Sequence, residues 1–280
     1  MKNITLHNGV KMPILGLGTF KITTGEDVYQ TILDALEIGY RHIDTAFMYD
    51  NEKGIGRAIK DSNIKRKSIF LTTKINCRVM NDPKLLEKHF NESLEDLQTD
   101  YVDLVLIHWP SHNPDVNQRC WEFLEKMYAL GKARSIGVSN FQVHHLDKLL
   151  KTAKIIPMIN QVELHPGLTQ EPLQKYLENK KIAIQSYGPL MKGQVFAAPF
   201  IEELTKLAEK NNCTIAQLIV AWGIKRNIIM IPKSVNYKRL EENFNAINIK
   251  LSNKTVEEIN KLNKGWRVYT DPDNNPIAAK

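Results

Sequence analysis

The sequence has few cysteines and no long apolar run, and each absence excludes a class of protein. Its 280 residues include only three cysteines, which lie far apart at Cys77, Cys120 and Cys213. An odd number of widely spaced thiols indicates neither a disulfide framework nor a CxxC metal motif, and is typical of reduced thiols in the cytoplasm. No stretch of about 18 apolar residues is present to cross a membrane. Residues 1–9 turn polar too early for a signal peptide, so we expect a cytoplasmic protein.

The sequence also lacks an arginine-rich arm or any other motif of a nucleic-acid-binding protein. Its formal net charge of +7 and its isoelectric point of about 9.1 would by themselves suit a polyanionic partner. However, the 38 Lys and Arg residues are scattered among 31 Asp and Glu residues. A phosphate-bearing small molecule would use the same positive field, so we expect such a ligand and no nucleic acid. No repeated apolar surface pattern stands out, and we expect a monomer.

Short β-leaning runs alternate with helix-like stretches along almost the whole chain. The pair Asn8-Gly9 between alternating residues predicts an N-terminal β-hairpin. Eight strands and intervening helices with no long linker predict a single α/β domain over residues 1–280, a (β/α)8 TIM barrel whose N-terminal end is capped by the hairpin. The strands are predicted at 14–18, 41–45, 69–75, 102–109, 134–138, 156–162, 182–187 and 228–233, and helices for example at 28–38, 83–97 and 121–130. Extra helices at 199–211 and 255–263 exceed a minimal barrel.

An open, doubly wound sheet is the alternative architecture. Such a sheet would be expected to begin with a glycine-rich dinucleotide-binding loop of the form GxGxxG. The segment from Gly16 to Lys21, which reads GLGTFK, lacks the third glycine. The sequence therefore favours the closed barrel.

Four chemically compatible side chains lie at the ends of three consecutive predicted strands. Asp44 and Tyr49 follow the second strand, Lys74 ends the third and His108 ends the fourth. Barrel enzymes carry their reactive groups at these ends, which converge on one pocket. A lysine beside a phenol lowers the pKa of the phenol, a carboxylate keeps that lysine charged, and an imidazole can position a carbonyl oxygen. The four residues predict a site that protonates a carbonyl oxygen when a hydride reaches the carbon.

Each of these residues also has an ordinary structural explanation. A strand-end Asp is often a helix N-cap, a strand-end Lys usually extends to solvent, and a single His is usually satisfied locally. Their combination on adjacent strand ends favours catalysis. A lyase in which Lys74 forms a Schiff base is a further alternative. We rank it last, because Asp44 would keep Lys74 protonated and non-nucleophilic.

Four segments resemble signature motifs of the aldo-keto reductase family. They are residues 39–46 followed by Tyr49, Asn51 and Glu52; residues 101–110; residues 136–141; and residues 231–235. The resemblance implies NADPH bound in an extended conformation across the barrel mouth. It also implies an NADP-dependent oxidoreductase that reduces aldehydes or ketones, with Asp44, Tyr49, Lys74 and His108 as catalytic tetrad and Tyr49 as general acid.

The same resemblance assigns residues to parts of the cofactor. Ser139, Asn140 and Gln161 match groups that hydrogen-bond the nicotinamide carboxamide, and Tyr187 matches the aromatic residue that stacks on its ring. Lys233, Ser234 and Arg239 match a clamp on the 2′-phosphate, where cations favour NADPH over NADH, and Glu242 and Asn243 match groups on the adenine. The full set of implied cofactor contacts is Gly18, Thr19, Phe20, Asp44, Ser139, Asn140, Gln161, Tyr187, Pro189, Leu190, Lys233, Ser234, Val235, Asn236, Arg239, Glu242 and Asn243.

Departures from the family pattern concern the substrate pocket, for which we expect Phe20, Phe47, Asn76, His108 and Trp109. Phe20 stands where many relatives have Trp, and Phe47 is bulkier than the usual residue. Asn76 and Cys77 stand where a Trp-Asn pair is common. The most similar branch contains bacterial reductases of the glyoxal, methylglyoxal and 2,5-diketo-D-gluconate type. The short loop after residue 110 and the short tail after residue 266 predict an open pocket.

Two other interpretations concern binding rather than turnover. A redox-sensing protein of the same fold would bind NADPH with little turnover. It is disfavoured because we expect no appended docking segment after residue 280. The pair His144-His145 suggests a metal site. It has no acidic or cysteine partner at ligand spacing in the sequence, so we interpret it as helix surface and expect no metal.

Overall fold

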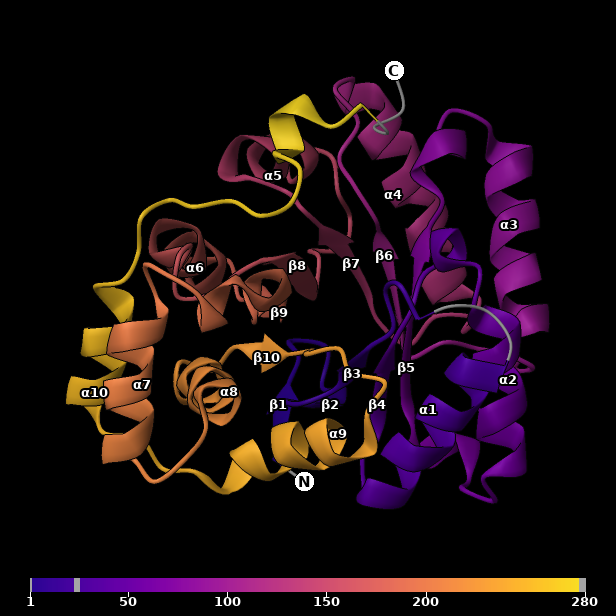
Figure 1. The fold of residues 1–280 in the computed structure, drawn as a ribbon. Coiled ribbons are helices and arrows are strands. Elements are labelled where there is room, and N and C mark those ends of the chain that lie inside the picture. The colour runs from indigo at the N-terminus through magenta and orange to yellow at the C-terminus, as the bar shows by residue number, and fades with distance from the viewer. Residues whose placement is uncertain (1, 23–25, 277–280) are drawn as a thin grey trace.

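Eight parallel strands form one closed sheet in the computed structural model, which describes residues 2–22 and 26–276. The sheet closes because Met230 N donates to Ile14 O and Gly16 N donates to Met230 O. Figure 1 shows the ring of strands with the helices outside it, and the predicted (β/α)8 barrel is confirmed. The strands are β3 (Leu17–Gly18), β4 (His42–Asp44), β5 (Phe70–Ile75), β6 (Leu104–Ile107), β7 (Ile136–Ser139), β8 (Ile159–Glu163), β9 (Ala183–Tyr187) and β10 (Ile229–Met230).

The N-terminal hairpin covers the end of the barrel where the strands begin. Strands β1 (Asn3–Thr5) and β2 (Lys11–Pro13) pair antiparallel, as the Asn8-Gly9 pair predicts. His7 Nε2 lies 3.1 Å from Ile156 O, ahead of β8, and Asn8 Nδ2 donates to Arg134 O, ahead of β7. These contacts confirm that the hairpin lies at the N-terminal end of the barrel, opposite the end where the predicted catalytic residues lie.

The helices form the outer layer of the barrel. Two of them, α7 and α10, are the predicted extra helices; they lie side by side (Figure 1), and Lys210 on α7 pairs with Glu258 on α10 at 3.7 Å. The helices are α1 (Glu26–Ile38), α2 (Glu52–Asp61), α3 (Pro83–Asp96), α4 (Pro114–Ala129), α5 (Val143–Leu149), α6 (Glu171–Asn179), α7 (Ile201–Lys210), α8 (Ile215–Lys225), α9 (Tyr237–Asn245) and α10 (Asn253–Asn260). The 3₁₀ helices are η1 (Phe47–Tyr49), η2 (Arg66–Ser68), η3 (Cys77–Val79), η4 (Met191–Phe196), η5 (Ala246–Asn248) and η6 (Pro272–Asn274).

Local sequence signals explain where several helices begin. Asp82 and Asn113 each cap a helix with a side-chain oxygen and are each followed by proline at the first helical position, which needs no N–H donor there. Helix α4 therefore starts at Pro114 rather than at the predicted residue 121. Thr214 and Gln217 form a reciprocal capping box at the start of α8.

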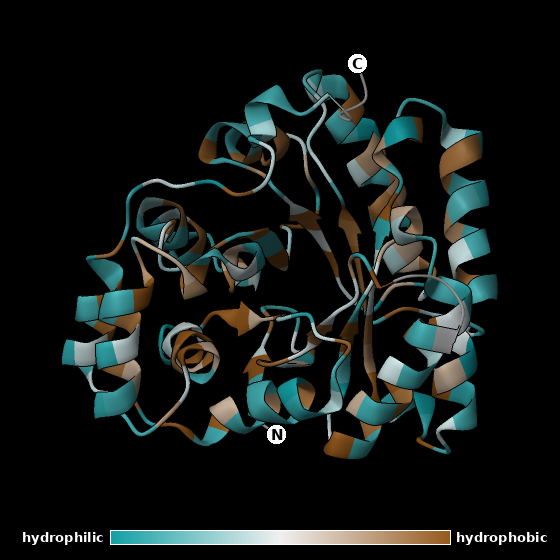
Figure 2. Cartoon of the chain, viewed as in Figure 1, coloured by the Kyte–Doolittle hydropathy of each residue, from teal (hydrophilic) through white to brown (hydrophobic). Residues whose placement is uncertain are grey.

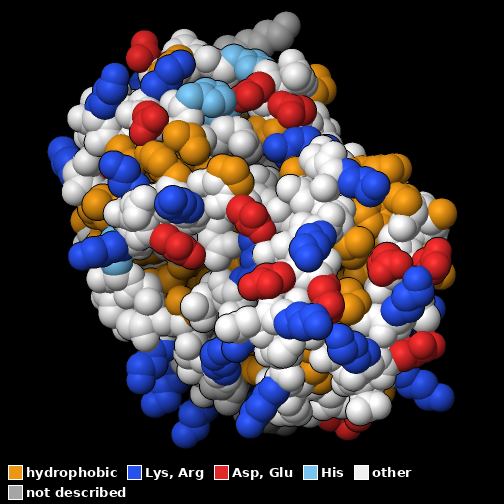
Figure 3. All heavy atoms as spheres, turned by 90° about the vertical axis from the view of Figure 1, so that its left-hand side faces the viewer, with side chains coloured by type: hydrophobic (Ala, Val, Ile, Leu, Met, Phe, Trp, Pro, Cys, Tyr) orange, Lys and Arg blue, Asp and Glu red, His pale blue; other side chains and the backbone are white. Residues whose placement is uncertain are grey.

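Apolar residues fill the space between strands and helices, and most charged residues face outward; Asp44, Glu52, Lys74, Asp103 and Glu163 are buried. Figure 2 shows the strands as mostly hydrophobic and the outer helices as mixed, with hydrophilic residues prominent. Acidic and basic side chains are interspersed on the face drawn in Figure 3. Among the described residues, no helix combines the length and the apolar character needed to span a bilayer.

Candidate active site

The four predicted catalytic side chains meet at the C-terminal ends of β4, β5 and β6. Asp44 ends β4, Lys74 lies near the end of β5 and His108 directly follows β6. The Lys74 ammonium donates to Asp44 Oδ1 at 2.5 Å and to Thr45 O at 2.8 Å, and it lies 3.4 Å from the Tyr49 hydroxyl oxygen. His108 Nε2 lies 3.5 Å from the same hydroxyl. One phenol is therefore held between an ammonium and an imidazole.

The loop that carries Tyr49 is fixed by Asn51. The Asn51 amide donates to Thr19 O at 3.0 Å and to Ile22 O at 3.2 Å, and its oxygen accepts from Thr45 Oγ1 at 2.7 Å. These bonds hold the loop after β4 against the loop after β3. The short 3₁₀ helix η1, which lies between Thr45 and Asn51 in the chain, then directs the Tyr49 ring into the barrel mouth.

Lys74 and Asp44 form a buried ion pair. Burial disfavours the ammonium, but Asp44 and Tyr49 together raise the pKa of Lys74 above its ordinary value. Gln161 Nε2 donates to the second Asp44 oxygen at 2.7 Å. A carboxylate that receives two donors satisfies the requirement of a buried charge for partners. Burial raises the pKa of Asp44 above its ordinary value, while the Lys74 charge and the hydrogen bonds from Lys74 and Gln161 oppose this rise. Because both ions are partnered in this way, we assign Lys74 as charged and Asp44 as ionised at neutral pH.

The titration states of Tyr49 and His108 are set mainly by burial. Burial raises the pKa of Tyr49 above its ordinary value, and the charge of Lys74 opposes this rise without reversing it. The expectation that Lys74 makes this phenol more acidic than a free one is therefore wrong in its net direction, because desolvation outweighs the nearby charge. Burial and the Lys74 charge hold the pKa of His108 well below its ordinary value, so its imidazole is neutral. The site thus contains a protonated phenol.

A cavity of about 1140 Å³ opens at this end of the barrel. Every residue that the family resemblance assigned to the cofactor lines it, together with Tyr49, His108 and Trp109. Lys74 is fully buried, and it is not among the lining residues. The cavity exceeds the roughly 300–1,000 Å³ of pockets for drug-sized ligands, which suits an elongated ligand.

The residues predicted to hold the nicotinamide form a hydrogen-bonded network in the protein itself. The Tyr187 hydroxyl donates to Asn140 Oδ1 at 2.7 Å, and Asn140 Nδ2 donates to His108 O at 3.0 Å. Ser139 Oγ donates to Gln161 O at 2.9 Å. Asn140 has a φ of 66°, in the left-handed region that Asn tolerates better than most residues. The network fixes the ring of Tyr187 and the amides beside the tetrad.

The opposite end of the cavity is basic. Lys233 lies beyond β10 and Arg239 in the first turn of α9, and neither forms an ion pair among the described residues. Asn236 caps α9 by accepting from Arg239 N at 3.2 Å. Two cations beside a helix N-terminus make a suitable site for a phosphate.

Two further side chains at this end were predicted to contact adenine. The Asn243 side-chain oxygen is buried and has no hydrogen-bond partner among the described atoms, so it can accept from an amino group. Glu242 instead accepts from the Thr214 hydroxyl at 2.5 Å. The buried acceptor on Asn243 fits an adenine amine, whereas Glu242 is already engaged by the protein.

Two predicted substrate-pocket residues do not line the cavity. Phe47 stacks on His89 with ring centroids 4.3 Å apart, and the Asn76 amide lies 3.2 Å from His89 Nδ1. Met48 lines the cavity instead. The structure therefore places Phe47 and Asn76 against His89 rather than in the cavity wall. Phe47 and Met48 are consecutive residues of η1 and point in different directions, and the Asn76 side chain caps η3 by accepting from Arg78 N.

The tail of the chain was missed as part of the site. We call residues 262–276 the C-terminal strap. Val268, Tyr269 and Thr270 on the strap line the cavity, so the short tail contributes a wall rather than leaving this side of the pocket bare. No local sequence pattern predicts this contact, because it depends on partners about a hundred positions earlier.

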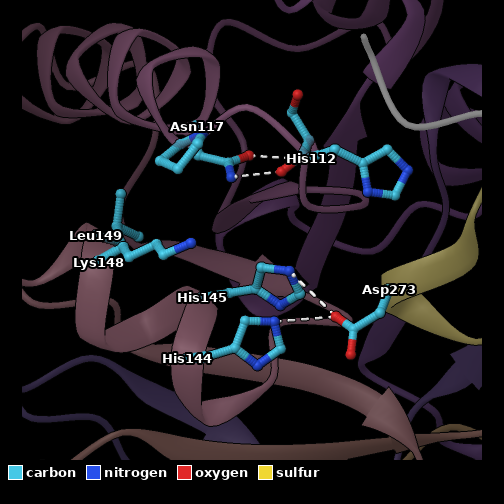
Figure 4. A pocket seen from close by; sticks show the side chains of 9 residues that line it. His112, Asn117, His144, His145, Lys148, Leu149 and Asp273 are labelled. Carbon is cyan, nitrogen blue, oxygen red and sulfur yellow. Dashed lines mark hydrogen bonds and ion pairs between the residues drawn. The ribbon is translucent and has the colours of Figure 1, made fainter.

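A second, smaller cavity of about 230 Å³ is lined by the histidine pair at the start of α5. Asp273 Oδ1 lies 3.0 Å from His144 Nε2 and 3.4 Å from His145 Nε2 (Figure 4). The pair therefore does have an acidic partner, contrary to the sequence interpretation. Gln142 N donates to His145 Nδ1, so the proton of a neutral His145 lies on Nε2 and faces Asp273. The cluster is better described as a hydrogen-bonded contact between α5 and η6 than as a metal site.

The closed barrel and this set of strand-end residues define an aldo-keto reductase. The aldo/keto reductase family model matches residues 14–264, and the chain belongs to that family. It is 45% identical over 273 residues to the glyoxal reductase of Bacillus subtilis, with 96% of each chain covered. It is 39% identical over 272 residues to the methylglyoxal reductase DkgA of Escherichia coli, again covering 96% of each. The crystal structure of a Gox0644 mutant in complex with NADPH is 34% identical with a TM-score of 0.90, covering 98% of each chain.

Proposed function

We propose that this protein reduces small aldehydes and ketones, such as methylglyoxal, with NADPH as the reductant. The observation that carries the proposal is the Tyr49 hydroxyl, which lies between Lys74 and His108 in the wall of the cavity. The relatives named for glyoxal and methylglyoxal reduction support the substrate class. Aromatic and apolar walls from Phe20, Met48 and Trp109 suit a small carbonyl compound.

The cavity fits NADPH at both of its ends. Lys233 and Arg239 provide two positive charges for a 2′-phosphate, and the unpartnered oxygen of Asn243 provides an acceptor for adenine. Tyr187, fixed by its bond to Asn140, offers a ring face near the tetrad for stacking. When bound, the nicotinamide supplies the hydride.

Tyr49 delivers the proton in this proposal. Its phenol is protonated at neutral pH because burial raises its pKa. As negative charge develops on the substrate oxygen, the Tyr49 hydroxyl donates its proton, and the Lys74 ammonium 3.4 Å away stabilises the resulting phenolate. Asp44 keeps Lys74 charged and oriented. The neutral imidazole of His108 positions the carbonyl oxygen beside the hydroxyl.

The direct test is oxidation of NADPH by the purified protein with methylglyoxal, an aromatic aldehyde and a sugar-derived ketone. We expect turnover with NADPH on at least one of these carbonyls and weaker activity with NADH, because NADH has no 2′-phosphate for Lys233 and Arg239 to bind. Tight NADPH binding without turnover on any carbonyl would instead indicate the redox-sensing alternative. Borohydride trapping of a carbonyl on Lys74 without NADPH would indicate the lyase.

A further inference from the structure

A buried carboxylate ties the middle of the C-terminal strap to the barrel. After α10 the strap runs past α6 and α5 toward α4 (Figure 1). Glu163, the last residue of β8, is fully buried. Its carboxylate accepts from Val268 N at 2.6 Å and from Tyr269 N at 3.3 Å. Arg267 Nη1 lies 3.7 Å from the same carboxylate. Three successive strap residues therefore converge on one side chain.

This carboxylate is fixed from the barrel side as well. His165 Nε2 lies 2.9 Å from Glu163 Oε1 and donates to it. His165 itself is fully buried in the turn after β8. Glu163 lies two residues beyond Gln161, whose amide donates to Asp44. The anchor of the strap and the partner of the tetrad carboxylate are thus on one strand.

The strap reaches the nicotinamide side of the cavity through Tyr269. The ring of Tyr269 meets the ring of Tyr187 edge-on, with centroids 5.1 Å apart and planes at 88°. A side chain at Gly188 would lie only 2.5 Å from the Tyr269 ring, so the glycine leaves room for it. Lys192 also contacts the strap. Its ammonium donates to Val268 O at 2.9 Å and lies 4.2 Å from the centroid of the Tyr269 ring. The Tyr269 ring therefore packs against the Tyr187 ring and restricts its orientation.

We propose that Glu163 is a positioning residue. By accepting hydrogen bonds from Val268 N and Tyr269 N it holds the strap as a wall of the cavity, and through the Tyr269 ring it fixes the orientation of the Tyr187 ring. The proposal rests on the proposed function in that Tyr187 is taken as the ring that meets the nicotinamide. Glu163 is not a catalytic residue, since it is absent from the cavity lining and touches none of Tyr49, Lys74 and His108 in the described contacts. It acts through Tyr269.

The substitution Glu163→Gln tests the hydrogen bonds between Glu163 and the strap with little change in side-chain volume. The glutamine oxygen can replace Oε1, which accepts from Val268 N and His165. Its amide nitrogen then replaces Oε2 and faces two other donors, Tyr269 N and Arg267. Because two donors cannot satisfy each other, the variant loses the Tyr269 N bond to Oε2 and the Arg267 contact, and Tyr269 N keeps only its longer bond to Oε1 at 3.4 Å. The variant therefore weakens the Tyr269 side of the anchor more than the Val268 side.

Asp103→Asn is a matched control at the opposite end of the barrel. Asp103, just before β6, is likewise a buried carboxylate that accepts from a backbone N–H, that of Leu71 at 3.0 Å, and from arginines, Arg66 at 2.8 Å and Arg134 at 2.7 Å. A purely structural role for Glu163 predicts that both variants behave alike. Under our proposal both lower the Tm, and only Glu163→Gln changes ligand binding.

The experiment measures NADPH affinity, methylglyoxal kinetics and trypsin cleavage of the strap at Lys264 and Arg267. For Glu163→Gln we expect the Kd for NADPH and the KM for methylglyoxal to rise about tenfold, equivalent to about 1.4 kcal/mol each. We expect kcat to stay within about threefold, because the tetrad is untouched, and strap cleavage to accelerate. Tyr269→Ala should reproduce these changes, and the double variant should add little to either.

Equal Kd, KM and cleavage rates in Glu163→Gln and Asp103→Asn would overturn the positioning role, as would fully additive effects of Glu163→Gln and Tyr269→Ala. If Glu163→Gln does not fold, Tyr269→Ala tests the same connection, and an unchanged Kd and KM in that variant would also overturn it. Strap cleavage needs no cofactor. A wild-type protein that does not bind NADPH would therefore overturn the proposed function, while the cleavage rates still test the anchor.

Discussion

At the scale of single residues, the site depends on a lysine that is charged although fully buried. Lys74 keeps its proton because Asp44, Thr45 O and the Tyr49 hydroxyl surround the ammonium. Residue types at strand ends were sufficient to predict that Asp44, Tyr49, Lys74 and His108 would meet, since parallel strands end at one rim. The sequence could not predict the net pKa of Tyr49, because desolvation depends on how completely the side chains around it exclude water.

Removing one charge of the Lys74–Asp44 ion pair should lower the free energy of unfolding more than removing both charges. Asp44→Asn leaves the Lys74 ammonium buried without its anion, and we expect a loss of about 3–5 kcal/mol in the free energy of unfolding. Asp44→Asn combined with Lys74→Met removes both charges, and we expect the double variant to be more stable than Asp44→Asn alone. Urea unfolding of the wild type, the two single variants Asp44→Asn and Lys74→Met, and the double variant measures this. Additive losses would show that the pair is not coupled.

Glu52 gives a prediction for the pH dependence of stability. Burial raises the pKa of Glu52 from 4.5 to about 7, while hydrogen bonds from Thr73 and Ser93 oppose the rise. Between these two values the folded state binds more protons than the unfolded state, so the free energy of unfolding falls as pH rises. The difference between the unfolded and folded pKa values corresponds to a loss on the order of 3 kcal/mol, which levels off above about pH 7.

The variant Glu52→Gln removes this titration and retains groups that can bond to both hydroxyls. We expect the stability difference between Glu52→Gln and wild type to shift in favour of the variant from pH 4.5 to 7, and to be constant above that. Guanidinium unfolding across this range measures the difference. Parallel stability curves for the two proteins would contradict the assignment of Glu52 as a protonated buried acid.

At the scale of elements, the eight strands could be predicted from the sequence, whereas the start of α4 and some side-chain directions in the loops could not. Buried parallel strands are apolar runs bounded by loops, and the hairpin turn carries its own signal in Asn8-Gly9. The start of α4 was placed late because the apolar pattern begins after the cap at Asn113. The contacts of Phe47 and Asn76 with His89 could not be predicted, because side-chain direction within and beside a short 3₁₀ helix has no simple sequence period.

Close packing of α2 on the end of α3 gives a prediction at this scale. A Cβ on Gly56 would lie 2.2 Å from Asp96 O and 2.7 Å from Leu97 Cα, which are backbone atoms that cannot rotate away. Helix propensity alone favours Gly56→Ala by about 1 kcal/mol. We expect the steric clash to outweigh this gain in helix propensity. The free energy of unfolding, measured by thermal or urea denaturation, should fall by about 1–3 kcal/mol. Lys60→Ala on the exposed side of α2 should change little, and a stabilised Gly56→Ala would contradict the packing.

At the scale of the whole molecule, the barrel brings together residues that the sequence keeps far apart. The sequence predicts the strap only as a short tail, yet the Glu163 carboxylate accepts hydrogen bonds from Val268 N and Tyr269 N across the fold. Asp273 likewise meets His144 and His145 although no local spacing connects them. Long-range contacts of irregular segments leave no periodic pattern in the sequence, so these parts became visible only in the folded protein.

The central claim is that Tyr49 is the proton donor of a carbonyl reductase. The most direct measurement is the single-turnover rate of NADPH oxidation by methylglyoxal in Tyr49→Phe, together with its Kd for NADPH. Because phenylalanine keeps the ring and removes only the hydroxyl, we expect the Kd to stay within about threefold and the rate to fall by about 10²–10⁴. A Tyr49→Phe variant that oxidises NADPH at the wild-type rate would contradict the account.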